Sequence, residues 1–256
     1  MYTIGLIAAM NQESAALLHC VKGWKRIAAG TLRGYTFTVS SKTCLLVTSG
    51  MGMRRAGEAA RTLLQMSSPG LLISFGIAGA VEADLGIGDV VLAEAVCRLE
   101  QGAPGSLLPL EPWSDESREA AAQALSNRGA HLFTGTAVTT GGEQVMEGQL
   151  PGVKHPILEM ETAGIAQLAA GKGIPLLSLR AISDGPCAPL PFDLGDMMDE
   201  DANLQTGRLL RAIIRNPTII FQSVRMMRNT KIAAGNAALA LLAALSKNAI
   251  GHSTAY

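Results

Sequence analysis

The sequence predicts an α/β protein whose main domain has three layers, followed by a helical extension. Short apolar runs, typical of buried parallel strands, alternate with helix-like segments along the first part of the chain. The 256 residues are also enough for one large domain with a substantial core and an appendage. We therefore place the main domain at residues 1–204 and the extension at residues 205–256.

Apolar periodicity and turn residues assign most elements of the main domain. Strands are expected at 3–9, 33–39, 43–48, 71–75, 89–96, 131–138 and 175–182. Helices are expected at 14–21, 54–66, 116–127 and 161–170. A loop at 101–117 separates two of these elements.

The extension is set apart by its charge. Residues 205–256 contain seven Lys or Arg and no acidic residue, so the net charge of zero conceals +7 here and −7 in residues 1–204. We expect a basic helix at 206–215, a second helix at 218–231 and an apolar run at 233–245. That run is too short to span a bilayer.

Composition also limits the cofactors and partners. The four cysteines have neither CxxC spacing nor a His at metal-ligand spacing, so we expect reduced thiols, no metal site and no cofactor. The N-terminus begins with a strand pattern and not a signal peptide, so the expected location is the cytoplasm. Aromatic residues make up only 4% of the chain, and binding of nucleic acid by the basic tail is therefore not expected.

Two acidic residues fall where an α/β enzyme would need them. Asp184 comes just after the apolar strand at 175–182, at the sheet edge where open α/β sheets bind ligands. Glu161 stands at the mouth of the helix at 161–170, so its carboxylate also faces a sheet edge. Two acids at one edge indicate acid chemistry on a small polar molecule.

The segment Glu159-Met160-Glu161, followed about twenty residues later by 180–184 (Arg-Ala-Ile-Ser-Asp), resembles a pattern of the purine nucleoside phosphorylase and methylthioadenosine/adenosylhomocysteine nucleosidase superfamily. Segments 4–13, 74–80 and 86–91 match further motifs of that family in the same order. The resemblance implies a mixed, partly closed central sheet flanked by helices, and a homo-oligomer. It also implies cleavage of the N-glycosidic bond of a purine nucleoside.

Cleavage of this bond needs an acid for the departing base and a nucleophile on the far side of the ribosyl group. By resemblance, Asp184 is the acid, and burial would give it the raised pKa that the role needs. Alternatively, it caps a helix or pairs with Arg180. Glu161 is expected to accept hydrogen bonds from the ribose hydroxyls, with Met160 packed against the ribose. Alternatively, Glu161 is a first-turn glutamate stabilised by the helix dipole.

Three further positions follow from the resemblance. Glu13, the third residue after Met10, is expected to orient the attacking water or the sugar. The alternative for Glu13 is a capping role at the helix that follows. Glu159 is expected to be a loop or rim acid. The segment Ile77-Ala78-Gly79 is expected to be a turn that presents backbone groups to base and sugar.

Two departures from the family pattern bear on the nucleophile. The phosphorylases bind phosphate through an Arg and a Ser around the glycine turn, where this chain has Ser74 and Ile77. We therefore expect an apolar, uncharged pocket there, which favours water over phosphate. A separate anion site, formed by Ser49, Arg54 and Arg55 at a helix start, stays open; alternatively these arginines are solvated surface charges.

A third departure concerns the base. In the nucleosidases an aromatic residue before the Glu-Met-Glu strand stacks on adenine, but segment 139–145 contains none. Recognition of the base is therefore expected from Gln144 and from main-chain groups near Ser183. Which purine is bound stays open.

Segment 74–79 and the basic tail with Arg215-Asn216-Pro217 are most similar to the hopanoid-biosynthesis branch of this superfamily. Members of that branch remove adenine from adenosylhopane, a nucleoside with a large lipid on its 5′ carbon. The tail would then rest on the anionic inner membrane face, or else pack on the core or a sister subunit. An ordinary methylthioadenosine/adenosylhomocysteine nucleosidase and a non-catalytic nucleoside-binding protein are the alternatives.

Overall fold

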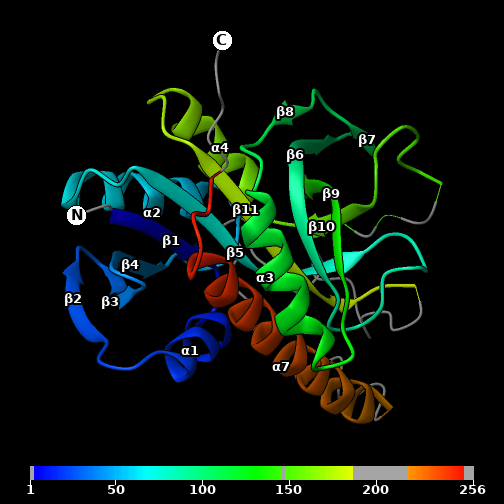
Figure 1. The fold of residues 1–256 in the computed structure, drawn as a ribbon. Helices are drawn as coiled ribbons and strands as arrows, with labels where there is room; N and C mark the ends of the chain where they lie inside the picture. Colours follow the sequence, from blue (N-terminus) through cyan, green and yellow to red (C-terminus); the bar gives the residue numbers. More distant parts are fainter. Residues whose placement is uncertain (1–2, 144, 146–147, 187–217, 251–256) are drawn as a thin grey trace.

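The computed structural model describes residues 3–143, 145, 148–186 and 218–250, the side chains of 218–223 excepted (Figure 1). The strands are β1 (Thr3–Ala8), β2 (Lys25–Ala29), β3 (Leu32–Val39), β4 (Lys42–Thr48), β5 (Leu71–Ala80), β6 (Val90–Glu100), β7 (Ala103–Pro104), β8 (Leu108–Pro109), β9 (Leu132–Thr139), β10 (Pro156–Glu159) and β11 (Leu176–Asp184). The helices are α1 (Asn11–Cys20), α2 (Met53–Met66), α3 (Asp115–Ser126), α4 (Thr162–Ala170) and α7 (Thr218–Leu245).

The strands form one mixed sheet in the order β10-β9-β6-β11-β5-β1-β4-β3-β2. Strands β11, β5, β1 and β4 run parallel, whereas β6 runs antiparallel to β11. β10 pairs with β9 on one side and, through Ile157 and Leu158, with the end of β5 on the other. This second pairing closes part of the sheet into a ring, as expected.

Helices cover both faces of the sheet, which confirms the three layers (Figure 1). Alternate residues of β1 point to opposite faces. Ile4 and Leu6 pack in the cluster that includes residues of α1, α3 and α7, whereas Ile7 packs with α2 and α4. Every one of these three β1 side chains is at most 1% exposed, so the sheet is buried on both sides.

The sequence did not predict strands β2 and β10. β2 is an edge strand with mostly exposed side chains, so it lacks an apolar pattern, and β10 has only four residues. The expected turn Ile77-Ala78-Gly79 is wrong, because these residues continue β5 as far as Ala80. Pairing with β11, and at the end also with β10, keeps this small-residue segment extended.

The two segments expected at 218–231 and 233–245 form one continuous helix, α7, because no helix-breaking residue separates them. Its second half belongs to the core: Ala233, Ala237, Leu241 and Leu245 are at most 1% exposed. No helix within the described ranges, α7 included, is long and apolar enough to cross a membrane. The expected helix at 206–215 and the domain boundary at 204 lie outside the described residues.

α2 and α4 approach each other closely at two glycines. A Cβ on Gly164 would overlap the carbonyl oxygen of Met53, and a Cβ on Gly57 would lie 3.3 Å from the carbonyl oxygen of Gly164. Backbone atoms cannot move aside as a flexible side chain can. The crossing of these helices therefore depends on the absence of a side chain at 164.

We predict that Gly164→Ala lowers the free energy of unfolding by about 1–3 kcal/mol, because the methyl group forces α2 and α4 apart. Gly171→Ala at the end of α4 is the matched control, since a Cβ there meets nothing closer than 3.5 Å. Urea unfolding followed by circular dichroism measures both. Equal stabilities for the two variants would contradict the close-approach argument.

Candidate active site

Arg180 of β11 is the centre of the candidate site. Its side chain is 1% exposed, although it carries a charge. Nη2 donates to Ser74 Oγ (2.7 Å) and to Glu159 Oε2 (2.8 Å), and it lies 3.5 Å from Glu161 Oε2. Burial alone would lower the pKa of Arg180, but the carboxylates of Glu159, Glu161 and Glu13 outweigh it, and the pKa is raised. The guanidinium is therefore a permanent cation.

Two donors of this guanidinium have no hydrogen-bond partner. Nε and Nη1 of Arg180 are buried and unpaired among the described residues. Nη1 lies beside Gly76: a Cβ on that glycine would be 2.7 Å from Nη1 and would overlap Glu13 Oε1. Glu13 and Arg180 thus meet at a point on β5 where only a glycine fits.

Glu13 lies in the first turn of α1 and is 1% exposed. Its Oε2 accepts from the amide of Met10 (2.7 Å), and its Oε1 accepts from the amide of Ile77 (2.9 Å). Glu13 therefore does cap the start of α1, which was the alternative role, and it also bonds β5. Burial raises the pKa of Glu13, while Arg180 and the backbone amides partly oppose the rise.

Glu159, the last residue of β10, is buried and not at the rim as expected. Its Oε2 accepts from Arg180 and from the amide and hydroxyl of Thr162 (2.7 Å each), and its Oε1 bonds the hydroxyl of Thr139. These bonds give the amide of Thr162, at the start of α4, a hydrogen-bond acceptor, and they compensate the charge of Arg180. Glu159 therefore anchors the site, and the protein already uses its oxygens.

Glu161 occupies the N-cap position of α4, although its side chain makes no capping hydrogen bond, and it is 5% exposed. Its Oε1 accepts from the amide of Gly52 at the start of α2 (3.0 Å). Burial raises the pKa of Glu161 to about 7; Arg180 opposes this rise, and the neighbouring Glu159 and Glu13 reinforce it. Met160 beside it is half-buried.

Asp184 ends β11, and its alternative partner Arg180 pairs elsewhere. Four residues along a strand separate the two by about 13 Å. Ser183 Oγ donates to Asp184 Oδ1 (2.6 Å), and a Cβ on Gly79 would lie 2.7 Å from Asp184 Oδ2. Burial raises the pKa of Asp184, and the Ser183 hydrogen bond opposes the rise.

The expectation of an apolar, uncharged pocket around Ser74 and Ile77 is wrong. Ser74 is fully buried and bonds the Arg180 guanidinium, so a cation lies where none was expected. Arg180 was expected only as an alternative partner for Asp184. The missed signal was a single arginine inside an apolar strand, because a buried cation requires carboxylates around it.

The other predicted positions are less closely connected to this cluster. Ser49 Oγ lies 2.8 Å from the carbonyl of Gly50 and 3.2 Å from that of Ala8. Arg54 pairs with Glu58 on the surface of α2 (2.8 Å), and Arg55 packs beside Gly50. The anion site thus stays a prediction. Ala78 is buried and pairs with Ile182 of β11, whereas Gln144 lies outside the described residues.

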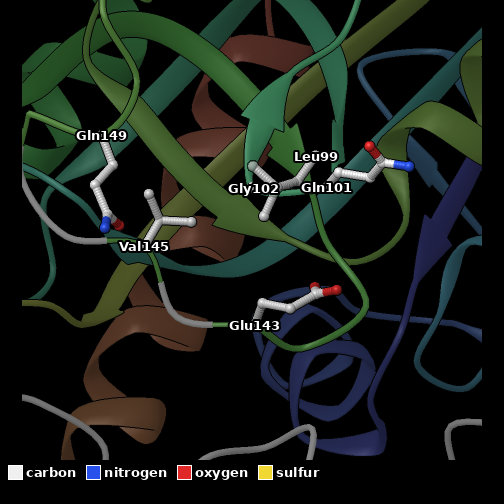
Figure 2. Close-up of a pocket in the computed structure, with 6 residues that line it drawn as sticks. All are labelled: Leu99, Gln101, Gly102, Glu143, Val145 and Gln149. Carbon is white, nitrogen blue, oxygen red and sulfur yellow. The ribbon is translucent and has the colours of Figure 1, made fainter.

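A cavity of about 410 Å³ lies at the ends of β6 and β9 (Figure 2). Its lining residues come from the end of β6 and from the segment after β9: Leu99, Gln101, Gly102, Glu143, Val145 and Gln149. The register places Arg98 of β6 opposite Thr139, which in turn pairs with Glu159. Leu99, the residue after Arg98, lines the cavity. The cavity therefore begins one residue beyond the row of the sheet in which Arg98, Thr139 and Glu159 are paired, and its size suits a small molecule.

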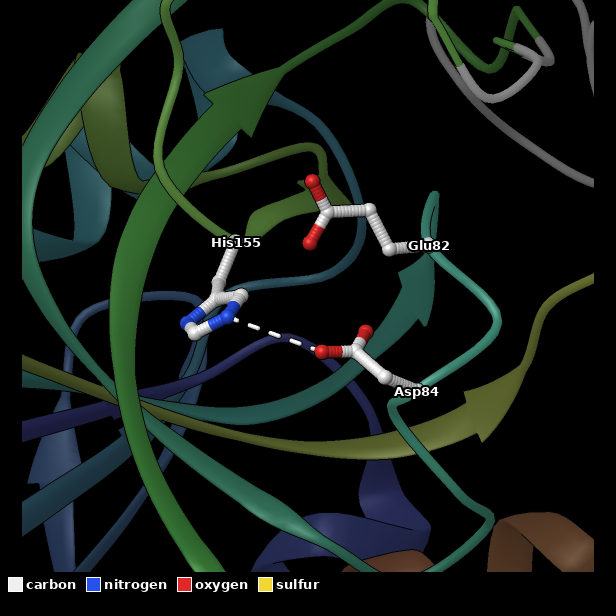
Figure 3. Close-up of side chains that lie close together, drawn as sticks. All are labelled: Glu82, Asp84 and His155. Carbon is white, nitrogen blue, oxygen red and sulfur yellow. Dashed lines mark ion pairs between the residues drawn. The ribbon is translucent and has the colours of Figure 1, made fainter.

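A second group of titratable side chains lies outside this site: Glu82, Asp84 and His155 (Figure 3). His155 Nε2 is 3.6 Å from Asp84 Oδ2, and His155 Nδ1 lies 3.0 Å from the carbonyl of Thr134. Their ligand-type atoms all lie within 4.8 Å of one another, a grouping that the sequence analysis did not anticipate. Asp84 is exposed and lies within ion-pair distance of His155, with Glu82 beside them.

A mixed, partly closed sheet with buried acids at its strand ends defines an α/β enzyme with the nucleoside phosphorylase-like fold. A solved nucleosidase from Neisseria meningitidis, in complex with methylthio-immucillin-A, superposes with a TM-score of 0.69 over 96% of this chain and 99% of that chain, at 24% identity. The futalosine hydrolase of Helicobacter pylori superposes with a TM-score of 0.67 over 95% and 97%, at 17% identity.

The chain belongs to the Phosphorylase superfamily, whose family model matches residues 3–215, and it is an enzyme that acts on N-glycosidic bonds. The 5′-methylthioadenosine/S-adenosylhomocysteine nucleosidase of Oceanobacillus iheyensis is 29% identical over 209 residues, which are 75% of this chain and 90% of that protein. The nucleosidase of the same name from Haemophilus influenzae is 27% identical over 230 residues, which are 83% and 99% of the two chains.

The raised pKa of Glu161 predicts a pH-dependent stability. Between its ordinary pKa of 4.5 and about 7, the folded protein keeps a proton that the unfolded chain has lost. This contribution is fully present below pH 4.5 and disappears as the pH rises through about 7. We expect the free energy of unfolding to fall over that interval, and to fall less steeply in Glu161→Gln.

Urea unfolding at several pH values measures this slope. Glu116→Gln, on the exposed start of α3, is the control and should keep the wild-type slope. Identical slopes in wild type and Glu161→Gln would show that Glu161 does not titrate in this range.

Proposed function

We propose that this enzyme hydrolyses the N-glycosidic bond of an adenosine-type nucleoside that carries a large apolar 5′ group, with adenosylhopane as its substrate. One observation carries the proposal: a buried Glu13–Arg180–Glu161 cluster and a separate, half-buried acid, Asp184, lie beside two points along β5. Gly76 marks the first point and Gly79 the second. Three residues of strand separate them, about 10 Å.

This separation suits the two demands of the reaction. The base leaves on one side of the sugar and needs a proton, which a carboxyl group with a raised pKa supplies near neutral pH. Asp184 has that property because it is mostly buried. The nucleophile attacks from the opposite side, where Glu13 and Arg180 lie. A ribosyl group that spans the two points would meet one of them on each side of β5, because positions three residues apart on a strand face opposite ways.

The nucleophilic side is suited to bind and activate water. Nη1 of Arg180 is an unpaired donor beside Glu13, so a water there would donate to the carboxylate and accept from the guanidinium. The raised pKa of Glu13 makes it a stronger base. Glu161, next to this point, would accept hydrogen bonds from the ribose hydroxyls, and Met160 would contact the ring.

The charge of the cluster favours water over phosphate. The single guanidinium is already compensated by Glu159 and Glu161, and Glu13 adds a third carboxyl group. A phosphate dianion would need an excess of cations, as the charge-assisted bonds that bind phosphate in proteins require. Ile77 adds an apolar side chain where a phosphate ligand would be needed. Hydrolysis is thus still favoured, now because three carboxyl groups surround the one cation and not because charge is lacking.

The proposal of a large apolar 5′ group rests on three sequence features: segment 74–79, the basic tail, and the absence of an aromatic residue in 139–145. The second candidate is a methylthioadenosine/adenosylhomocysteine nucleosidase, because the relatives from Oceanobacillus iheyensis and Haemophilus influenzae bear that name. These two candidates share the chemistry of the site and differ in the 5′ group that it accepts.

Adenine release from four nucleosides separates the candidates: adenosylhopane in detergent, adenosine, methylthioadenosine and adenosylhomocysteine, each with and without phosphate. We expect phosphate-independent release from adenosylhopane, with the soluble nucleosides at least about 100-fold slower in kcat/KM, a difference of about 2.7 kcal/mol. Preference for methylthioadenosine would support the second candidate. A requirement for phosphate would overturn hydrolysis.

Asp184 and Ser183 provide a test of the acid. Asp184→Asn should lower kcat/KM by about 10²–10⁴-fold, since the base then leaves without a proton. In the wild type, kcat/KM should fall as the pH rises and Asp184 loses its proton. Ser183→Ala removes the hydrogen bond that opposes the raised pKa, so this fall should move to higher pH. Ser117 in α3 is another buried serine, and Ser117→Ala should leave the pH at which kcat/KM falls unchanged.

A further inference from the structure

The first half of α7 extends past the sheet edge that carries Asp184. Asn236 Nδ2 donates to the carbonyl of Gly88 (2.8 Å), and the amide of Gly88 donates to the carbonyl of Ile182 (2.8 Å). Asn236 is therefore level with the end of β11. The last turn of α7 lies at the opposite edge, where Lys42 Nζ, at the start of β4, donates to the carbonyl of Leu245 (2.9 Å).

Residues that precede Asn236 thus lead away from the body on the Asp184 side. α3, which packs along α7, ends at Ser126, and Arg128 just after it reaches Asn236 Oδ1 (3.4 Å). Figure 1 shows the start of α7, in orange, extending beyond the end of α3. At 1.5 Å per residue, Val224 lies about 18 Å farther along the helix than Asn236.

This projecting part of α7 exposes large apolar side chains. Val224 is 63% exposed, Met227 is 68% exposed and Ile232 is 40% exposed. The second half of the same helix is buried against the sheet, so the two halves have different environments. Val224 and Met227 are three residues apart, so their exposed side chains adjoin on one side of the helix.

The same part of the helix is cationic. Arg225, Arg228 and Lys231 are exposed, and no acidic residue occurs anywhere in 205–256. Val224, Met227, Arg228 and Lys231 follow the i, i+3, i+4, i+7 spacing that places residues on one side of a helix. We call these four residues the α7 face. It combines two apolar and two cationic side chains.

We propose that the α7 face docks on an anionic lipid bilayer. Val224 and Met227 would enter the boundary between headgroups and acyl chains, while the ends of Arg228 and Lys231 reach the lipid phosphates. A nucleic acid would match the cations but not the apolar side chains. A purely apolar protein surface would leave both cations unpaired. Charge and apolarity together fit an anionic bilayer.

Docking would also turn the Asp184 edge of the sheet toward the membrane, because the α7 face projects from that edge. A lipid-linked nucleoside could then reach the site without leaving the bilayer completely. Only this last consequence rests on the proposed function. The docking itself rests on the exposure, charge and position of the α7 face.

Flotation with vesicles tests the proposal on the full chain without any nucleoside. Wild type should float with vesicles of phosphatidylglycerol and phosphatidylcholine, and far less with phosphatidylcholine alone. Arg228→Gln/Lys231→Gln should weaken binding about 30-fold, since each cation near an anionic surface contributes about five-fold. Val224→Ser/Met227→Ser should weaken it as well. Arg26→Gln/Lys172→Gln removes the same charge from exposed sites elsewhere and should keep binding intact.

Three results would overturn docking. The first is no flotation of the wild type, and the second is an equal loss of vesicle binding in the control Arg26→Gln/Lys172→Gln. The third is a wild-type dimer in light scattering that does not bind vesicles and that dissociates in Val224→Ser/Met227→Ser. The last would assign the face to a second copy of the chain. Adenine release measured in detergent keeps the two proposals apart. Adenine release without flotation would support the proposed function and overturn docking. Flotation without adenine release would support docking and overturn the proposed function.

Discussion

The burial of one guanidinium, that of Arg180, is the constraint on which the rest of the structure depends. A charge without water around it is tolerated only when carboxylates and hydroxyls compensate it closely. Its partners come from three other places in the chain: Ser74 on β5, Glu159 at the end of β10 and Glu161 at the start of α4. Removal of Glu159, the carboxylate to which Arg180 donates a hydrogen bond, would break a buried ion pair, at a cost of about 3–5 kcal/mol. The ion pairs therefore fix where these elements meet.

The same constraint prepares the chemistry. The cluster is buried, so the pKa of Glu13 and that of Glu161 are raised, and both carboxyl groups hold protons more tightly than they would in water. Two guanidinium donors are left without partners on the side of Glu13. Gly76 leaves room between them, since any side chain would overlap the carboxylate. The atoms of Arg180 that compensate its charge are thus different from the one to which the proposed mechanism assigns a water.

Much of the fold could be predicted because its buried strands carry strong apolar patterns. β1, β4 and β11 differ from the predicted ranges by one or two residues. β2 could not be predicted, since an exposed edge strand needs no apolar residues. The acids Glu13, Glu161 and Asp184 were found by resemblance, but not the role of Glu159 or the charge beside Ser74. Those depend on β10 pairing with both β9 and β5, a long-range contact that four residues cannot encode locally.

The closure of the sheet by β10 has a consequence for the behaviour of the chain in a crowded cell. A strand with an unpaired edge is a template for adding another strand, and so for aggregation. Because β10 bonds a neighbour on each side, β2 is the only one of the longer described strands with an open edge. Lys25 and Arg26 are exposed on that strand. Charges of this kind discourage strand addition, so the ring and the two cations together protect the sheet from self-association.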